Sequence, residues 1–308
     1  MSLRRSAEPA QDLALPQPLS RPIPRSGWAF WRHVLARTYA EFNEDNVMLL
    51  AAAVAFYAVL ALVPAITAAV SLYALISDPA SVQSQFGQLE GLMPSGSFDL
   101  MRQQVERIVS SENRSGLWFI VGIVVALWST MSGMKGLIDS LSVVYEVSDQ
   151  RSLLRYNLVA LAMTFGALLW LAVSIAGLVA IPIVLSFFPF AGFGTLLAAW
   201  LRWPALLVIL MIGLAALYRF GPHRKHPRWE WVSPGNLFAA AGWLAGSALM
   251  SWYLSNFANY NATYGSLGAA AALMLWLWVT AVIVLTGAEL NSEYYKAQCA
   301  VRGVPVEV

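Results

Sequence analysis

Long apolar runs without a charged residue alternate with short polar segments along most of the chain. The last run, Leu267 to Ala288, holds 22 residues, which is about 33 Å of α-helix at ~1.5 Å per residue. The hydrocarbon core of a bilayer is roughly 30 Å thick. Asp, Glu, Lys and Arg are all missing from Trp231 to Ala288, a length that holds two spans and a turn. The pattern predicts a helical membrane protein.

Six spans are expected from this pattern. They are Val47 to Ile76, a span beginning at Leu117, about Leu153 to Phe187, Gly194 to Phe220, about Val232 to Leu254, and Leu267 to Ala288. Proline removes a helix hydrogen bond, and glycine loosens a helix end, so some positions are expected to break or hinge helices. These positions are Pro64, Pro182, Pro204, Gly265 and Gly268.

The segments outside the spans divide the chain further. Residues 1–26 are polar and Pro-rich, which predicts a disordered cytoplasmic leader. Residues 27–297 form the membrane domain, and 298–308 form a cytoplasmic tail. Gly27 to Asn46 mixes aromatic and charged residues, as expected for an amphipathic helix at the headgroups. The external segment 78–115 keeps helical spacing and is interpreted as short amphipathic surface helices.

Charge and composition give the orientation. The chain is 58% hydrophobic and 12% charged, which suits an all-α polytopic membrane protein. Assigning Lys and Arg to alternate sides of six spans puts fourteen on the side of the termini and four on the other. The positive-inside rule therefore predicts that both termini are cytoplasmic. The single Cys299 excludes an intrachain disulfide.

Polar residues at the ends of the predicted spans are the candidate transport residues, because charge in a membrane is expensive and usually functional. The candidates for a polar cavity are Lys135, Asp139, Glu289, Asn291, Asn46, Tyr57 and Tyr264. Lys135 and Asp139 lie about 27 and 33 Å along the second span. Two interpretations stay open: an interfacial pair in which Lys135 snorkels, or the lining of a cytoplasm-facing cavity.

A basic loop joins the fourth and fifth predicted spans. Its cationic residues, expected to contact anionic lipid at the inner leaflet, are Arg219, Arg224, Lys225 and Arg228. His223 and His226 lack a third ligand, so no metal site is predicted. The loop is too short and too near the membrane to favour nucleic acid. Nucleotide-binding, metalloprotease and serine-hydrolase motifs are missing, so neither an enzyme nor a cofactor is expected.

Several motifs resemble the YihY/virulence factor BrkB family. They are Ala51-Ala-Ala-Val-Ala-Phe-Tyr57 with Leu62-Val-Pro64, Trp128-Ser-Thr-Met-Ser-Gly133, Tyr218-Arg-Phe-Gly-Pro222, Tyr264-Gly-Ser-Leu-Gly268 and Gly287-Ala-Glu-Leu-Asn291. The resemblance covers about residues 30 to 297, although Ala61 stands where a Ser is expected. It implies a six-helix protein of the bacterial cytoplasmic membrane.

The resemblance does not fix the activity. The family was once labelled a tRNA-processing ribonuclease, and has been tied to serum resistance, envelope lipid handling and cation/proton exchange. The leading hypothesis is a transporter or flippase-like protein for an amphipathic or lipid-linked solute. The alternatives are a cation/proton antiporter using Asp139 or Glu289, and a non-transporting envelope scaffold. Expected partners are membrane lipids, the solute and a coupling ion (H⁺, Na⁺ or K⁺), with a homo-oligomer left open.

Overall fold

The computed structural model describes residues 27–76, 116–186, 193–224, 232–257 and 266–306. Every regular element in these ranges is an α-helix, in agreement with the all-α prediction. The helices are α1 (Trp28–Glu44), α2 (Val47–Ile76), α5 (Gly116–Val144), α6 (Leu153–Ser186), α7 (Phe193–Phe220), α8 (Pro234–Phe257) and α10 (Ser266–Arg302). The predicted leader and the surface helices within 78–115 lie outside the described residues.

The helix boundaries follow the apolar runs closely. Helix α2 has the predicted bounds, and α5, α6 and α7 begin or end within one residue of them. Helix α10 instead continues 14 residues past Ala288, to Arg302. It continues because Leu290 and Ala297 pack on Phe30 and Val34 of α1, which gives this polar extension a buried face.

The expected helix-breaking prolines lie inside continuous helices. Pro64 is in α2, Pro182 in α6 and Pro204 in α7, so none of them ends a helix. Gly268 lies within the first turn of α10, and Gly265 falls outside the described residues. These prolines therefore do not determine where the helices begin or end.

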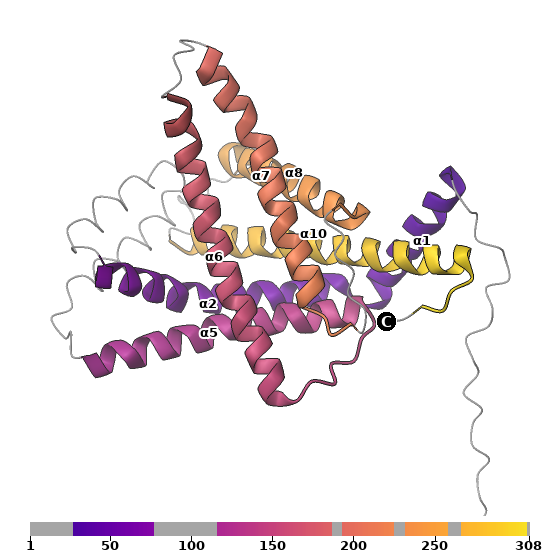
Figure 1. Ribbon diagram of the computed structural model, residues 1–308, viewed down its shortest axis with the longest axis horizontal. Coiled ribbons are helices and arrows are strands. Elements are labelled where there is room, and N and C mark those ends of the chain that lie inside the picture. The colour runs from indigo at the N-terminus through magenta and orange to yellow at the C-terminus, as the bar shows by residue number, and fades with distance from the viewer. Residues whose placement is uncertain (1–26, 77–115, 187–192, 225–231, 258–265, 307–308) are drawn as a thin grey trace, which may run out of the picture.

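The helices form a bundle crossed by a helical pair (Figure 1). Helix α2 packs along α5 and α10, and the three run in similar directions across the view. Helices α6 and α7 pack on each other and cross this group steeply. Helix α8 packs on α10 and α7, and α1 lies beside the last turns of α10.

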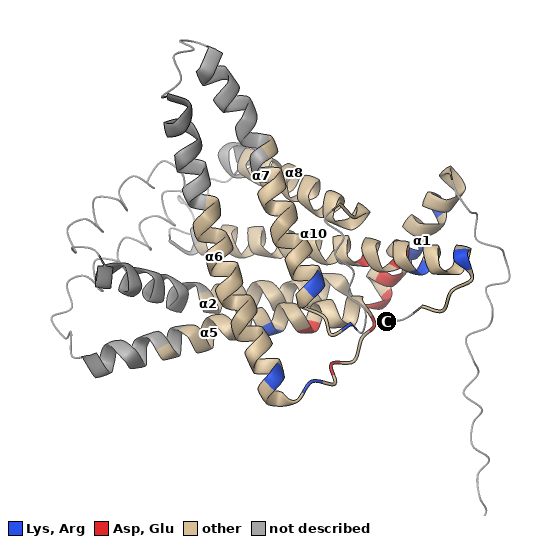
Figure 2. Ribbon diagram, viewed as in Figure 1, with Lys and Arg blue, Asp and Glu red and all other residues tan. Residues whose placement is uncertain are grey.

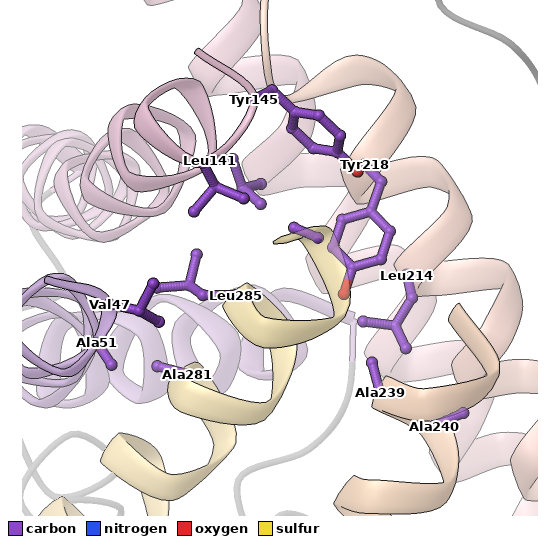
Figure 3. Close-up of a cluster of buried hydrophobic side chains, with 12 residues drawn as sticks. Val47, Ala51, Leu141, Tyr145, Leu214, Tyr218, Ala239, Ala240, Ala281 and Leu285 are labelled. Carbon is purple, nitrogen blue, oxygen red and sulfur yellow. The ribbon is translucent and has the colours of Figure 1, made fainter. Parts of the chain in front are cut away.

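Small side chains allow close packing at the centre of this bundle (Figure 3). Ala51 of α2, Ala239 and Ala240 of α8 and Ala281 of α10 are buried in one cluster with larger residues. Alanine brings helix backbones together, and such contacts are the main attraction between helices in lipid. Tyr218 adds a polar link, because its hydroxyl donates to the carbonyl of Val284 at 2.6 Å.

Two described helical segments are long and apolar enough to cross a membrane. They are Leu153–Ser174 of α6 and Ala270–Arg302 of α10. The pair Trp28–Glu44 and Val47–Ala61, bent by 61°, gives a third crossing if counted as one span. Large apolar side chains such as Leu158, Phe165 and Leu169 face outward from α6, as lipid contact requires.

Candidate functional site

Acidic and basic residues gather where α1 meets α10 (Figure 2). At this place, which we call the α1 end, the turn after α1, the C-terminal part of α10 and the end of α5 come together. Red and blue ribbon segments lie close together there, whereas most of the described helix length elsewhere is uncharged. The site is therefore built from elements far apart in sequence.

The most buried acidic group at the α1 end is Glu289 of α10. Its side chain is 1% exposed, and no N–H or O–H group of the described residues donates to either of its oxygens. Its acidic neighbour is Asp45, in the turn between α1 and α2, and each of the two carboxyls influences the protonation of the other. Two carboxylates supply no donor, so a hydrogen bond between them requires one shared proton. We call Asp45 and Glu289 the carboxyl pair.

A network of ion pairs lies next to the carboxyl pair. Arg37 of α1 bonds Glu41 and also lies 3.5 Å from Glu293 of α10. Lys296 donates to Glu293 at 2.6 Å and to Glu146, after α5, at 2.7 Å. We call these five residues the ionic network. It ties α1, the end of α5 and α10 together.

Two residues with left-handed backbone conformation position these groups. Asn46 has φ 52° and ends the turn that redirects the chain by 61° between α1 and α2, so that Asp45 faces α10. Glu146 also has φ 52°, two residues after the end of α5, where glycine is the usual residue. Its backbone N–H donates to the Val143 carbonyl at 2.8 Å, which closes the end of α5.

Three carboxylates of the ionic network have the spacing of metal ligands. Oxygen atoms of Glu41, Glu146 and Glu293 lie within 4.8 Å of one another. Arg37 and Lys296 already bond these carboxylates and supply two compensating charges. The geometry fits a network of ion pairs better than a metal centre, because cations would have to displace both bases.

Burial changes the protonation of the acids in and beside this turn. Burial raises the pKa of Asp45 above its ordinary value, and the interaction with the Glu289 side chain partly offsets that rise. Burial also raises the pKa of Glu41, against the attraction of Arg37. Both acids therefore hold a proton more readily than they would in water.

The predicted candidates Lys135 and Asp139 lie elsewhere, on an outward face of α5. Asp139 is exposed and accepts a hydrogen bond from the hydroxyl of Tyr156 at 2.7 Å. The ammonium of Lys135 lies 5.4 Å from the ring centroid of Trp128 and 5.8 Å from that of Tyr156. Among the described residues, neither side chain forms a hydrogen bond or an ion pair with Asp45 or Glu289.

The remaining polar candidates have separate places. Asn291 Oδ1 accepts a hydrogen bond from the backbone N–H of Gly235 at 2.8 Å. The Nδ2 group of Asn46 donates to the carbonyl of Glu44 at 3.2 Å. Tyr57 packs its ring against Gly136 of α5, and Tyr264 falls outside the described residues. Of the predicted residues that the structure describes, Glu289, Asn291 and Asn46 belong to the elements that meet at the α1 end, and Asn291 bonds α8 there.

Two basic residues near the predicted lipid-contacting loop turn toward protein. Arg224 donates to the carbonyl of Tyr218 at 2.7 Å and lies 4.3 Å from the ring of Tyr145. Arg151 donates to the carbonyl of Gly221 at 3.0 Å. Both satisfy carbonyls at the end of α7, where cations are favoured. Arg219 lies over the ring of Phe220, and Lys225 and Arg228 lie outside the described residues.

Asp45, Glu41 and Glu293 were not among the residues predicted from the sequence. A signal for them exists in the spacing of charges. Arg37, Glu41 and Asp45 are four residues apart, and Glu289, Glu293 and Lys296 follow the same helical spacing. Each set lies on one helix face, so two complementary charged faces were visible, although the pairing between them was not.

Comparison with known proteins agrees with the helical architecture. The model of the family described as virulence factor BrkB matches residues 38–303. The "putative ribonuclease-like protein YfkH" of Bacillus subtilis is 31% identical over 249 residues, covering 80% of this chain and 89% of that protein. No solved structure matches the chain.

Relatives described only as membrane proteins match with similar coverage. "UPF0761 membrane protein Mpe_A1422" of Methylibium petroleiphilum is 27% identical over 273 residues, which is 84% of this chain and 61% of that protein. A Neisseria meningitidis relative, "UPF0761 membrane protein NMC0462", is 28% identical over 270 residues, or 85% and 63%. The chain thus spans less than two thirds of these longer relatives. With the family model matched from α1 to the end of α10, the chain belongs to the virulence factor BrkB family of membrane proteins.

Proposed function

We propose that this protein exchanges protons for cations across a membrane, with the carboxyl pair as the exchanging group. The observation that carries the proposal is the burial of Glu289 against Asp45 without any hydrogen-bond donor from the described residues. A buried carboxylate with no donor and no paired base is unstable. Such a group must hold either a proton or a cation.

The exchange requires one carboxyl proton and one ion at a time. When the pair shares a proton, the net charge of the site is −1. Loss of that proton leaves two facing carboxylates, whose repulsion is relieved when a monovalent cation such as Na⁺ or K⁺ binds between them. Carboxylate oxygens are suitable ligands for such hard cations. Binding of the two is therefore competitive, which is the basic requirement for antiport.

Access to the pair would be controlled by α1. This helix packs Phe30 and Val34 on α10, and Trp31 stacks on Tyr294 with ring centroids 5.5 Å apart. The ionic network holds the same two helices together through Arg37 and Glu293. Displacement of α1 would expose Glu289 to water on one side of the membrane.

The proposal places the protein in the bacterial cytoplasmic membrane with six spans and both termini inside. Glu289 lies 23 residues after Ser266, the first residue of α10, which is about 35 Å along the helix. This distance exceeds the roughly 30 Å hydrocarbon core. The carboxyl pair would thus lie at the cytoplasmic edge, and the rest of α10 would extend beyond it.

Proton exchange in liposomes tests the proposal. Purified protein is reconstituted with an internal pH dye, and Na⁺ or K⁺ is added outside. We expect exchange by the wild type and loss of exchange in Glu289→Gln, whose amide can still donate to Asp45 in place of the shared proton. Glu44→Gln is the matched control, because Glu44 is exposed at the end of α1. Equal exchange by Glu289→Gln and wild type would refute the proposal.

Movement of an amphipathic or lipid-linked solute is the second candidate function. It is favoured by the outward position of Lys135 and Asp139 on α5, beside the aromatic rings of Trp128 and Tyr156. Charged groups on an outer face meet lipid headgroups directly. Scrambling of fluorescent lipid in the same liposomes would support this function if it were lost in Lys135→Ala. Inactivity in both assays would favour a scaffold role.

A further inference from the structure

A polar stripe on the outer face of α5 lies beside the first turn of α6. Trp128, Lys135 and Asp139 are seven and four residues apart, so they stack on one helix face. Val124, a further turn away, is exposed on the same face, and Trp128 is 65% exposed. We call these four residues and Tyr156 the α5 stripe. It has an apolar end and a charged end.

The two charges of the α5 stripe do not bond each other. Their spacing of four residues would allow an ion pair, yet none of the ion pairs in the described chain includes Lys135 or Asp139. Lys135 lies over two aromatic rings, and Asp139 uses one oxygen to accept the Tyr156 hydroxyl. The stripe therefore presents an ammonium and a carboxylate from residues that are about 6 Å apart along the helix axis.

We infer that the α5 stripe binds the headgroup of a zwitterionic phospholipid of the phosphoethanolamine type. Lys135 would bond the phosphate through a charge-assisted hydrogen bond. Asp139 would accept from the headgroup ammonium with its second oxygen. The acyl chains would then lie along Trp128 and Val124, toward the apolar end. An anionic lipid without an amine satisfies only Lys135, so the arrangement distinguishes the two headgroups.

The position of the stripe along α5 agrees with a headgroup. Asp139 is five residues before Val144, the last residue of the helix, or about 8 Å. Tyr156, whose hydroxyl reaches Asp139, has the amphipathic ring that is enriched at this level of a bilayer, whereas Trp128 lies about 17 Å further into α5, at the level of the acyl chains. The inference does not depend on proton exchange, because the carboxyl pair is on the α1 and α10 side of the bundle.

Native mass spectrometry of the full-length protein tests the inference. Protein in detergent is incubated with equal amounts of short-chain phosphatidylethanolamine and phosphatidylglycerol, and retained lipid is counted. We expect the wild type to prefer phosphatidylethanolamine, and Asp139→Asn to lose that preference by about tenfold, the effect of one charge-assisted hydrogen bond. Lys135→Ala should weaken retention of both lipids.

Two further variants separate binding from folding. Leu154→Ala removes an exposed apolar side chain from the same turn of α6 and leaves the α5 stripe intact, so we expect it to retain the preference. Arg155→Ala removes an exposed charge nearby and should also retain it. The inference is overturned if Asp139→Asn keeps the preference, or if Leu154→Ala or Arg155→Ala loses it equally. Soluble phosphoethanolamine that binds as tightly as the lipid would overturn the lipid assignment.

Discussion

Asn291 of α10 accepts a hydrogen bond through its Oδ1 from the backbone N–H of Gly235, at 2.8 Å. Gly235 is the second residue of α8, where a backbone N–H has no partner within its own helix. The hydroxyl of Ser233 accepts a hydrogen bond from the next backbone N–H of the helix, that of Asn236, at 3.2 Å. A side chain of α10 thus completes the start of α8 and fixes how the two helices meet.

This contact predicts a strong effect of a methyl group at Gly235. A Cβ there would overlap the Gly287 carbonyl oxygen and the Asn291 side chain, so the helices would have to move apart. We expect Gly235→Ala to lower the free energy of unfolding by about 1–3 kcal/mol, as overpacking does. Thermal unfolding in detergent measures the change.

Gly166→Ala in α6 is the matched control for this substitution. A Cβ at Gly166 has no atom within 4 Å, and alanine favours a helix by about 0.5–1 kcal/mol over glycine. We therefore expect equal or higher stability for Gly166→Ala. Equal effects of the two substitutions would contradict the close packing of α8 on α10.

Substitutions at Trp170 in α6 and Gly213 in α7 are expected to have non-additive effects on stability. The indole N–H of Trp170 donates to the Ile209 carbonyl at 2.9 Å, and a Cβ at Gly213 would lie 2.7 Å from the indole. Gly213→Ala should therefore destabilise the wild type, and less so when combined with Trp170→Leu. A double-mutant cycle of unfolding midpoints measures the coupling, for which we expect about 0.5–3 kcal/mol. Additive effects would contradict the contact.

Asp45 predicts a pH dependence of stability. Its pKa is raised by burial, so protonated Asp45 stabilises the fold. This stabilisation is complete below about pH 4, the ordinary pKa of Asp. Stability then falls as the pH rises through the raised pKa. The charged groups around Asp45 are Glu289, Glu146, Lys296 and Glu44.

We expect Asp45→Asn to flatten the decline of the unfolding midpoint between pH 4 and pH 8, relative to wild type, because the amide does not titrate in this range. Unfolding midpoints at stepped pH values test this. Asp139→Asn, at an exposed site, is the control. An unchanged decline in Asp45→Asn would show that another group causes it.

The left-handed backbone at Glu146 predicts an unusual order of stability among variants at this position. Its left-handed backbone favours glycine by roughly 1 kcal/mol, whereas its ion pair with Lys296 is half-exposed and should contribute at most about 1 kcal/mol. Glu146→Gly should therefore be about as stable as wild type, and Glu146→Gln should be less stable than both. Unfolding midpoints decide the order. A Gly variant below the Gln variant would mean that the turn tolerates side chains without strain.

Apolar run length predicted the helices well but not their partners. Val47–Ile76 was found with its bounds because hydrophobicity and length suffice for a span. The extension of α10 was missed because its residues are polar and become helical through contact with α1. Glu289 was a candidate from its position, but its partner Asp45 is 244 residues away (289 − 45). Helical spacing shows which residues share a face, and only the tertiary packing shows which faces meet.

The packing of Phe30 against α10 has a topological consequence, because it brings the two ends of the described chain to one place. A chain whose first and last helices meet on the same side of a bilayer must traverse it an even number of times. With α1 and the end of α10 both outside the bilayer, as proposed above, the number of crossings is even, whatever the direction of insertion. Two halves of a split fluorescent protein, fused to the termini, would share one compartment and assemble within a single molecule.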